Sequence, residues 1–217
     1  MIRAILWDFG GVITSSPFEA FNRLEKERGA PLDLIRRVNA TNPDNNAWAL
    51  FESDRITLDE FDELFARESS AAGHEIRGKD VINVLAGDIR PRMVAVLKFC
   101  RRHLRVGCIT NNVRAGHGPG MTQDDATAAS VADIMSIFDV VIESSEEGVR
   151  KPDPRIYQIA CERMRIDPTE TIFLDDLGIN LKPARAMGMQ TIKVINEGQA
   201  ISELAALTGL DLESIHA

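Results

Sequence analysis

The sequence predicts an α/β fold, in which a doubly wound, Rossmann-like parallel sheet carries a small helical cap inserted after its first strand. Three observations predict it. Short apolar runs that each end at a polar residue recur along the chain, as in strands buried on both faces of a parallel sheet. Between them lie stretches with an apolar period of about 3.6 residues, typical of amphipathic helices. One long stretch near the N-terminus has this helical period alone, which predicts an insertion into the alternating pattern.

The apolar runs define the expected strands. The first, residues 4–7, stops at Asp8, and the second, residues 105–109, stops at Thr110. Later runs predict strands at 139–143, 171–174 and 190–195, and the fourth strand is followed by Asp175 and Asp176. Helices are expected near 93–100, 123–137, 154–165 and 178–187. Strands and helices in alternation predict a parallel sheet covered by helices.

The stretch between the first two strands is expected to be helical throughout. Ser16 with Glu19, and Thr57 with Glu60, form capping-box patterns, and each opens a run of apolar residues spaced along one helix face. Weaker helical patterns lie near 31–40 and 45–53. We therefore predict an α/β core domain of residues 1–14 and 87–217, and a helical cap domain of residues 15–86.

Charge and composition exclude several classes of function. A formal net charge of −8 disfavours binding to the nucleic-acid backbone, which needs a basic face. No run of about 18 apolar residues and no charged leader with a cleavage site is visible, so we expect neither a membrane span nor a signal peptide. The three cysteines lie in apolar runs without metal or disulfide spacing, which favours a reducing cytoplasm. The sequence does not indicate an oligomeric state.

Polar residues at the strand ends form the candidate site, because ligands of doubly wound sheets bind outside the carboxyl ends of the strands. Clustered carboxylates repel one another unless a cation lies between them, and hard oxygen ligands suit Mg²⁺. The sequence therefore predicts a magnesium-dependent phosphohydrolase that acts on a small phosphorylated molecule, in which Asp8 attacks phosphorus and forms an aspartyl-phosphate. The expected site residues are Asp8, Thr110, Asn111, Lys151, Asp175 and Asp176.

Four segments resemble, in order, the signature motifs of the haloacid dehalogenase-like hydrolases: WDFGGVI, CITNN, VRKPDPRIY and FLDDLGINLKPARAMGM. Within that superfamily, FDVVIES, KPDPRIY and LDDLGINLKPAR look most like the phosphatase-type N-terminal domain of soluble epoxide hydrolase and its bacterial relatives. The resemblance implies that Asp8 is the nucleophile and that Thr110 and Lys151 clamp the phosphate. It also implies that Asp176 binds the metal with support from Asp175, and that Asn111 joins the phosphate or substrate contacts.

The sequence departs from the family pattern at Gly10, where most phosphatases of the family have a second aspartate that serves as the general acid. General acid catalysis contributes roughly 100- to 10,000-fold, so we expect slow expulsion of poor leaving groups. The family position binds magnesium through its backbone carbonyl, which Gly10 retains as a candidate ligand. Asn180 stands where many relatives are acidic, and it either hydrogen-bonds the site or lies on a helix face. His117 is a candidate for the missing proton donor.

Two other functions remain open at this point. A metal-independent 2-haloacid dehalogenase would use the same Asp8 nucleophile and would not need the missing acid, but the Asp175-Asp176 pair favours a metal. Alternatively, Gly10 and Asn180 mark a weakened site that binds a phosphorylated ligand without turnover.

Overall fold

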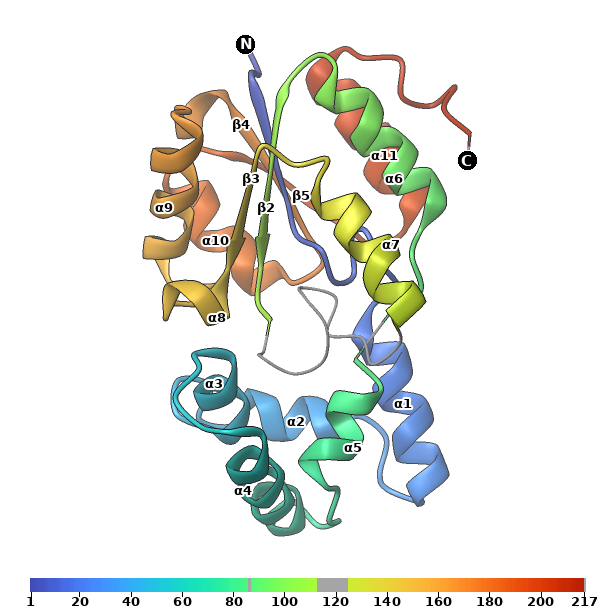
Figure 1. The fold of residues 1–217 in the computed structure, drawn as a ribbon, viewed down its shortest axis with the longest axis vertical. Coiled ribbons are helices and arrows are strands. Elements are labelled where there is room, and N and C mark those ends of the chain that lie inside the picture. Colours follow the sequence, from blue (N-terminus) through green and yellow to red (C-terminus); the bar gives the residue numbers. More distant parts are fainter. Residues whose placement is uncertain (86, 113–124, 217) are drawn as a thin grey trace.

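The computed structural model describes residues 1–85, 87–112 and 125–216 of the 217-residue chain. Five parallel strands form one sheet in the order β3-β2-β1-β4-β5 (Figure 1). Their order along the sheet reverses beside β1, as in a doubly wound fold. The predicted fold class and the predicted strands are confirmed. The strands are β1 (Ala4–Trp7), β2 (Arg105–Thr110), β3 (Val140–Glu143), β4 (Thr171–Asp175) and β5 (Gln190–Lys193).

Helices cover both faces of the sheet, because the side chains of each strand alternate between two cores. Ile5 and Trp7 of β1 are fully buried against α6 (Pro91–Arg101), α7 (Asp125–Met135) and α11 (Glu197–Thr208). The neighbouring Leu6 is buried on the other face, against α9 (Pro154–Met164) and α10 (Gly178–Ala186). Trp7 is therefore a core residue, as expected from its position beside Asp8. Two short elements, α8 (Ser144–Glu147) and a 3-10 helix (Pro168–Glu170), complete the core.

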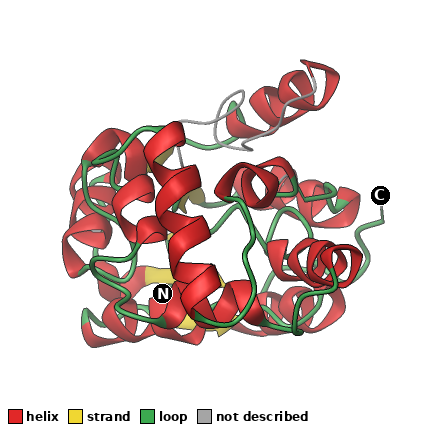
Figure 2. Cartoon of the chain, turned by 90° about the horizontal axis from the view of Figure 1, so that it is seen from below, coloured by secondary structure: helices red, strands yellow, loops and turns green. Residues whose placement is uncertain are grey.

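Among the described residues between β1 and α6, five helices form what we call the helical insertion. In Figure 1 these helices lie below the carboxyl ends of the strands. Figure 2 shows the molecule from below, and there the helices lie in front of the sheet. Their own core is rich in aromatic rings: Phe51 stacks on Phe61 with centroids 4.6 Å apart, and Trp48 packs edge-on against Phe61 at 5.7 Å. The domain boundaries at residues 15 and 86 stay a prediction. The helices are α1 (Pro17–Arg28), α2 (Leu34–Ala40), α3 (Ala47–Glu52), α4 (Leu58–Ala71) and α5 (Gly78–Asn83).

One of the two predicted helix caps is wrong. Thr57 and Glu60 form a complete capping box at the start of α4, as expected. Ser16 occupies the cap position of α1, but its side chain makes no hydrogen bond to that helix. Its hydroxyl lies 3.1 Å from Oδ2 of Asp176 and donates to it instead, so a tertiary contact replaces the local cap.

The insertion joins the core through two paired chain segments. Thr14 and Ile89 form an antiparallel bridge, and Arg90 N donates to the backbone oxygen of Ile13 at 2.9 Å. A Cβ at Gly87 would lie 2.5 Å from the backbone oxygen of Ser15, so this close approach requires glycine. The incoming and outgoing segments thus run side by side.

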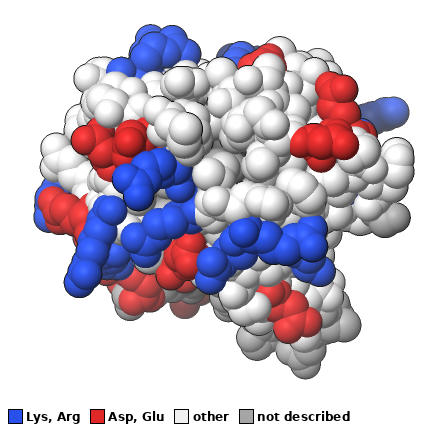
Figure 3. Space-filling view, turned by 90° about the horizontal axis from the view of Figure 1, so that it is seen from above, with Lys and Arg blue, Asp and Glu red and all other residues white. Residues whose placement is uncertain are grey.

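The end of the molecule opposite the insertion carries a band of Lys and Arg side chains beside acidic patches (Figure 3). Arg3 precedes β1 and Arg105 opens β2, which places both at this end of the sheet. Arg3 lies 3.7 Å from the carboxylate of Glu170, so part of this charge is paired. No helix in the described ranges is both long and apolar enough to cross a membrane.

Candidate active site

The predicted acidic residues meet where the strand order reverses. Asp8 directly follows β1, and Asp175 ends the adjacent β4. The backbone N of Asp8 donates to the oxygen of Leu174 at 2.8 Å, which ties the two strand ends together. Carboxylate oxygens of Asp8, Asp175 and Asp176 lie within 4.8 Å of one another. The parallel topology therefore brings together carboxylates that are far apart in the sequence.

Lys151 lies at the centre of this acidic cluster. Its side chain is 1% exposed, and Nζ lies 2.8 Å from both Asp8 Oδ1 and Asp175 Oδ2. Burial by itself lowers the pKa of the amine, but the charges of Asp175 and Asp8 outweigh it and raise that pKa well above its usual value. Lys151 is therefore a fixed positive charge between two carboxylates.

The amide of Asn111 holds the backbone of Lys151. Asn111 Nδ2 donates to the oxygen of Lys151 at 3.0 Å, and Asn111 Oδ1 accepts from its N–H at 2.8 Å. This two-point contact links the end of β2 to the loop before α9. Among the described residues, Asn111 is thus a partner of Lys151, whereas the sequence suggested a direct contact with substrate.

The sequence left open whether Asn180 hydrogen-bonds to the site or only lies on a helix face, and the structure shows that it hydrogen-bonds within the site. Its Nδ2 donates to both oxygens of Asp175, at 3.1 and 3.0 Å. Tyr157 in turn donates its hydroxyl to the backbone oxygen of Asn180 at 2.7 Å. Asp175 also accepts from the N–H of Leu177 at 2.8 Å, so protein donors engage both of its oxygens. Asp175 is fully buried and rigidly held.

Two carboxyl groups of the cluster have raised pKa values. Burial is the largest cause of the raised pKa of Asp8; Lys151 opposes it, while Asp175 and Asp176 add to it. Burial followed by the charge of Asp175 raises the pKa of Asp176 to about 6. The single positive charge of Lys151 does not balance three ionised carboxylates, so the fully ionised cluster is electrostatically unfavourable without a further cation.

Asp176 lies against the turn that follows β1. A Cβ at Gly11, where φ is +76°, would lie 2.3 Å from Oδ2 of Asp176, so glycine is needed there for both backbone and space. At Gly10, by contrast, a Cβ would meet no heavy atom within 4 Å.

Thr110 is buried at the end of β2, which runs beside β1 with Trp7 paired to Cys108. His117 falls outside the described residues.

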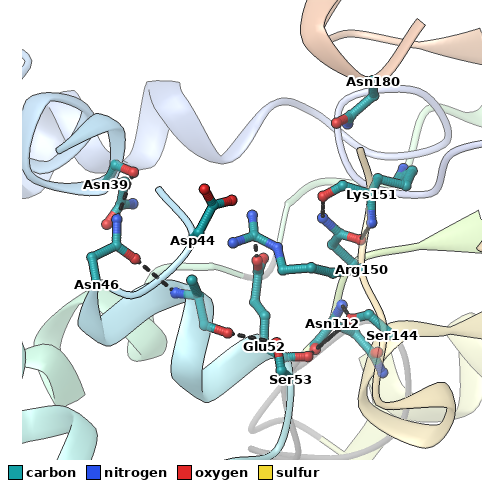
Figure 4. Close-up of polar contacts among 12 residues, drawn as sticks. Asn39, Asp44, Asn46, Glu52, Ser53, Asn112, Ser144, Arg150, Lys151 and Asn180 are labelled. Carbon is teal, nitrogen blue, oxygen red and sulfur yellow. Dashed lines mark hydrogen bonds and ion pairs between the residues drawn. The ribbon is translucent and has the colours of Figure 1, made fainter. Parts of the chain in front are cut away.

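The insertion contacts the core beside Lys151, through α3. Arg150 pairs with the carboxylate of Glu52 at 2.8 Å, and Ser144 Oγ donates to the backbone oxygen of Glu52 at 3.2 Å (Figure 4). Glu52 is 5% exposed, and burial raises the pKa of its carboxyl although Arg150 opposes the shift. Sequence reasoning missed this pair, because a glutamate in a helix and an arginine in a loop give no sign that they meet.

A cavity of about 450 Å³ lies at another part of the same boundary. It borders the metal-site candidate Asp176 but does not include Asp8 or Lys151 in its lining. From the insertion it is lined by Ser16, Phe18 and Arg36, and from the core by Arg90, Asp176 and Lys193, among others.

Comparison with known proteins gives a consistent family. A family model described as a haloacid dehalogenase-like hydrolase matches residues 2–188. The chain is 33% identical over 216 residues to acyl-CoA dehydrogenase family member 10 of Mus musculus, covering 97% of this chain and 19% of that protein. It is 29% identical over 220 residues to bifunctional epoxide hydrolase 2 of Mus musculus, covering 96% and 39%. The chain thus spans less than half the length of either relative.

Other relatives match over nearly their whole length. Phosphatase MT3486 of Mycobacterium tuberculosis is 32% identical over 209 residues, with 91% of this chain and 89% of the relative covered. Among solved structures, a HAD family enzyme of Bacteroides thetaiotaomicron in complex with magnesium and inorganic phosphate superimposes with a TM-score of 0.61. It is 22% identical and covers 94% of this chain and 99% of its own, which is a likeness of fold.

Proposed function

The chain belongs to the haloacid dehalogenase-like hydrolases, and on that premise we propose that it is a magnesium-dependent phosphatase of small phosphorylated molecules that uses Asp8 as its nucleophile. One observation carries the proposal: the carboxylate of Asp8 contacts a buried ammonium and also belongs to a cluster of three carboxylates. The ammonium of Lys151 lies 2.8 Å from Asp8 Oδ1, and Asp176 shares the acidic cluster. Such a site can accept a phosphate and a cation together.

The donor set fits a magnesium ion. Asp8 and Asp176 offer hard oxygen ligands. Burial is the largest cause of their raised pKa values and neighbouring carboxylates add to it, and a dication would favour the ionised form of both groups. We propose that these two residues hold the ion together with the backbone carbonyl of Gly10. Asp175 belongs to the same cluster, but we assign it mainly to holding Lys151, because protein donors already engage its oxygens. When bound, magnesium neutralises a phosphate dianion and orients it for attack.

The remaining roles follow from the side chains themselves. Oδ1 of Asp8 accepts from Phe9 N at 2.7 Å and pairs with Lys151, while no donor among the described residues contacts Oδ2. We assign Oδ2 as the atom that attacks phosphorus. As the Oδ2–P bond forms, the bond from phosphorus to the ester oxygen breaks, and the leaving oxygen takes a proton from water. A water molecule then attacks phosphorus and gives up a proton to solvent as the Oδ2–P bond breaks, which releases inorganic phosphate and restores the carboxylate of Asp8. Lys151 and Thr110 hold the oxygens of the transferring group.

An Asp8→Asn protein tests this directly. The amide cannot form an acyl phosphate, so the magnesium-dependent hydrolysis of p-nitrophenyl phosphate should fall by about a thousandfold or more. Asp59→Asn, an exposed change in the insertion, is the matched control and should keep the wild-type rate. Full activity of the Asp8→Asn protein, or wild-type hydrolysis that is unchanged in a chelator, contradicts the proposal.

Gly10→Asp tests the missing general acid. A Cβ at Gly10 meets no heavy atom within 4 Å, so the substitution causes no clash at that atom. We expect hydrolysis of alkyl phosphates, which have poor leaving groups, to rise by about a hundredfold, and hydrolysis of p-nitrophenyl phosphate to change little. Equal effects on both substrates would show that protonation of the leaving group is not what the site lacks.

The alternatives make opposite predictions. A 2-haloacid dehalogenase would release halide in the presence of a chelator. A site weakened at Gly10 and Asn180 would bind phosphate esters without turnover over a broad panel. The phosphatase is favoured because Asn180 hydrogen-bonds to Asp175, and Asp175 pairs with Lys151. The asparagine therefore still holds the charged groups of the site in position.

A further inference from the structure

The cavity beside Asp176 gathers positive charge from three separate elements. Arg36 comes from α2, Arg90 from the segment before α6, and Lys193 from the end of β5. The guanidinium of Arg36 rests on the ring of Phe18, 4.4 Å from its centroid, and also pairs with the exposed carboxylate of Asp33 at 3.3 Å. The insertion and the core thus both contribute cations to one cavity.

The charges of Arg90 and Lys193 are not neutralised within the described ranges. Arg90 Nη1 donates to the backbone oxygen of Gly11 at 2.8 Å, which fixes the guanidinium but leaves its charge. Neither Arg90 nor Lys193 forms an ion pair with a carboxylate of residues 1–85, 87–112 or 125–216. The charges of Arg90 and Lys193 are therefore free to face another anion, while Arg36 is already shared with the exposed carboxylate of Asp33.

The start of α10 adds to this potential. Gly178 and Ile179, its first residues, line the cavity, and the preceding Leu177 provides no side-chain cap. The first N–H groups of a helix lack partners within it and favour a negative charge nearby.

Apolar side chains complete the wall. Ile179 and Ile195 line the cavity although they are 56% and 72% exposed, and Phe18 faces it from the insertion. Large exposed apolar residues next to unpaired cations suit a ligand with an apolar body and a negative end. A volume of about 450 Å³ is within the usual range for small organic ligands.

We propose that this cavity binds a second anionic group, a carboxylate or another phosphate, on the organic part of the substrate, held by Arg36, Arg90 and Lys193. The proposal rests on the proposed function and narrows the substrate class to phosphate esters with a second negative charge on a partly apolar body. Because the cavity shares Asp176 with the acidic cluster, one molecule can occupy both places.

Non-hydrolysable probes test binding separately from turnover. Calorimetry with magnesium would compare phenylphosphonate with 4-carboxyphenylphosphonate and 1,4-phenylenebisphosphonate. We expect at least one second anionic group to tighten binding about tenfold in the wild type, and the tighter probe identifies the preferred group. This preference should disappear in Arg36→Gln and in Lys193→Gln, both of which change exposed side chains. Arg37→Gln is the matched control: it removes the same charge from α2, outside the cavity lining, and should keep the preference.

The outcomes separate this proposal from the phosphatase itself. If the wild type binds all three probes equally, or if Arg36→Gln and Lys193→Gln both keep the preference, the cavity does not bind the second anion. If the preference holds and depends on these residues while no phosphate ester is hydrolysed, the cavity is supported and the phosphatase is not. Parallel kinetics with phenyl phosphate and 4-carboxyphenyl phosphate should show the same change in the ratio of kcat/KM, mainly through KM.

Discussion

Two parts of the boundary between the helical insertion and the core differ in the sign, pairing and burial of their charged side chains. In the part beside Lys151, which we call the closed side, Glu52 and Arg150 are of opposite sign, pair at 2.8 Å and are largely buried. In the part beside Asp176, the open side, Arg36 and Lys193 are of the same sign, exposed, and border a cavity. The same interface thus pairs opposite charges of insertion and core at one place and brings like charges of insertion and core to one cavity at another.

This difference separates attachment from recognition. Removing one partner of a buried ion pair leaves an uncompensated charge in the interior, whereas exposed pairs contribute little to stability. The closed side should therefore hold the insertion on the core and keep the loop of Lys151 in place. The open side should contribute little to stability and act on ligands. Substitutions on the closed side are therefore expected to lower stability, and substitutions on the open side are expected to alter ligand binding.

The largest effect is expected on the closed side, in Arg150→Ala. This change leaves Glu52 buried without its cation, and we expect the free energy of unfolding to fall by about 3 kcal/mol in urea titrations. Arg155→Ala, which breaks the exposed pair with Glu162, is the matched control and should cost less than about 1 kcal/mol.

A double-mutant cycle sharpens this result. If the loss comes from the unpaired carboxylate, adding Glu52→Gln to Arg150→Ala should restore part of the stability. A full loss that persists in the double variant would assign the effect to the backbone near Lys151, and the closed side would not depend on its ion pair.

The sequence predicts the fold and the convergence of the acidic cluster because both follow from local signals. Each strand is an apolar run that ends at a polar residue, and parallel strands bring their carboxyl ends to one edge of the sheet. That rule alone brings Asp8, Thr110 and Asp176 to one edge, although their distances and individual roles are not contained in it. The helix α11 was missed even though Asn196 caps it and Gly209 ends it, because no motif drew attention to that segment.

Contacts across the boundary could not be predicted, because they depend on competition between partners. Ser16 has the residue type and position of a helix cap, yet its hydroxyl donates to Asp176. In the sequence, Glu52 is indistinguishable from other helical glutamates, and only the fold brings Arg150 next to it. In both cases, the sequence gives the donor or the acceptor and only the tertiary structure selects its partner.

A second, smaller effect is expected on the open side, in Ser16→Ala. Loss of the hydrogen bond to Asp176 should weaken the apparent affinity for Mg²⁺ about tenfold, since groups that orient a ligand carboxylate affect metal binding. Stability should change little, because Ser16 makes no cap contact with α1. Thr57→Ala is the matched comparison: it should cost about 1 kcal/mol of stability through the lost capping box and leave magnesium binding unchanged. Unchanged magnesium affinity in Ser16→Ala would argue against Asp176 as a ligand.

The smallest effect concerns pH and returns to the closed side. Burial raises the pKa of Glu52 in the folded protein above its ordinary value of 4.5, so the folded state takes up a proton before the unfolded chain does. By linkage, the wild type should gain stability relative to Glu52→Gln as pH falls through the raised pKa towards 4.5, and lose it as pH rises again. Urea unfolding of both proteins at a series of pH values measures the difference. A difference that does not change with pH would mean that Glu52 is solvated in the folded state, and the contrast between the two sides would lose its electrostatic basis.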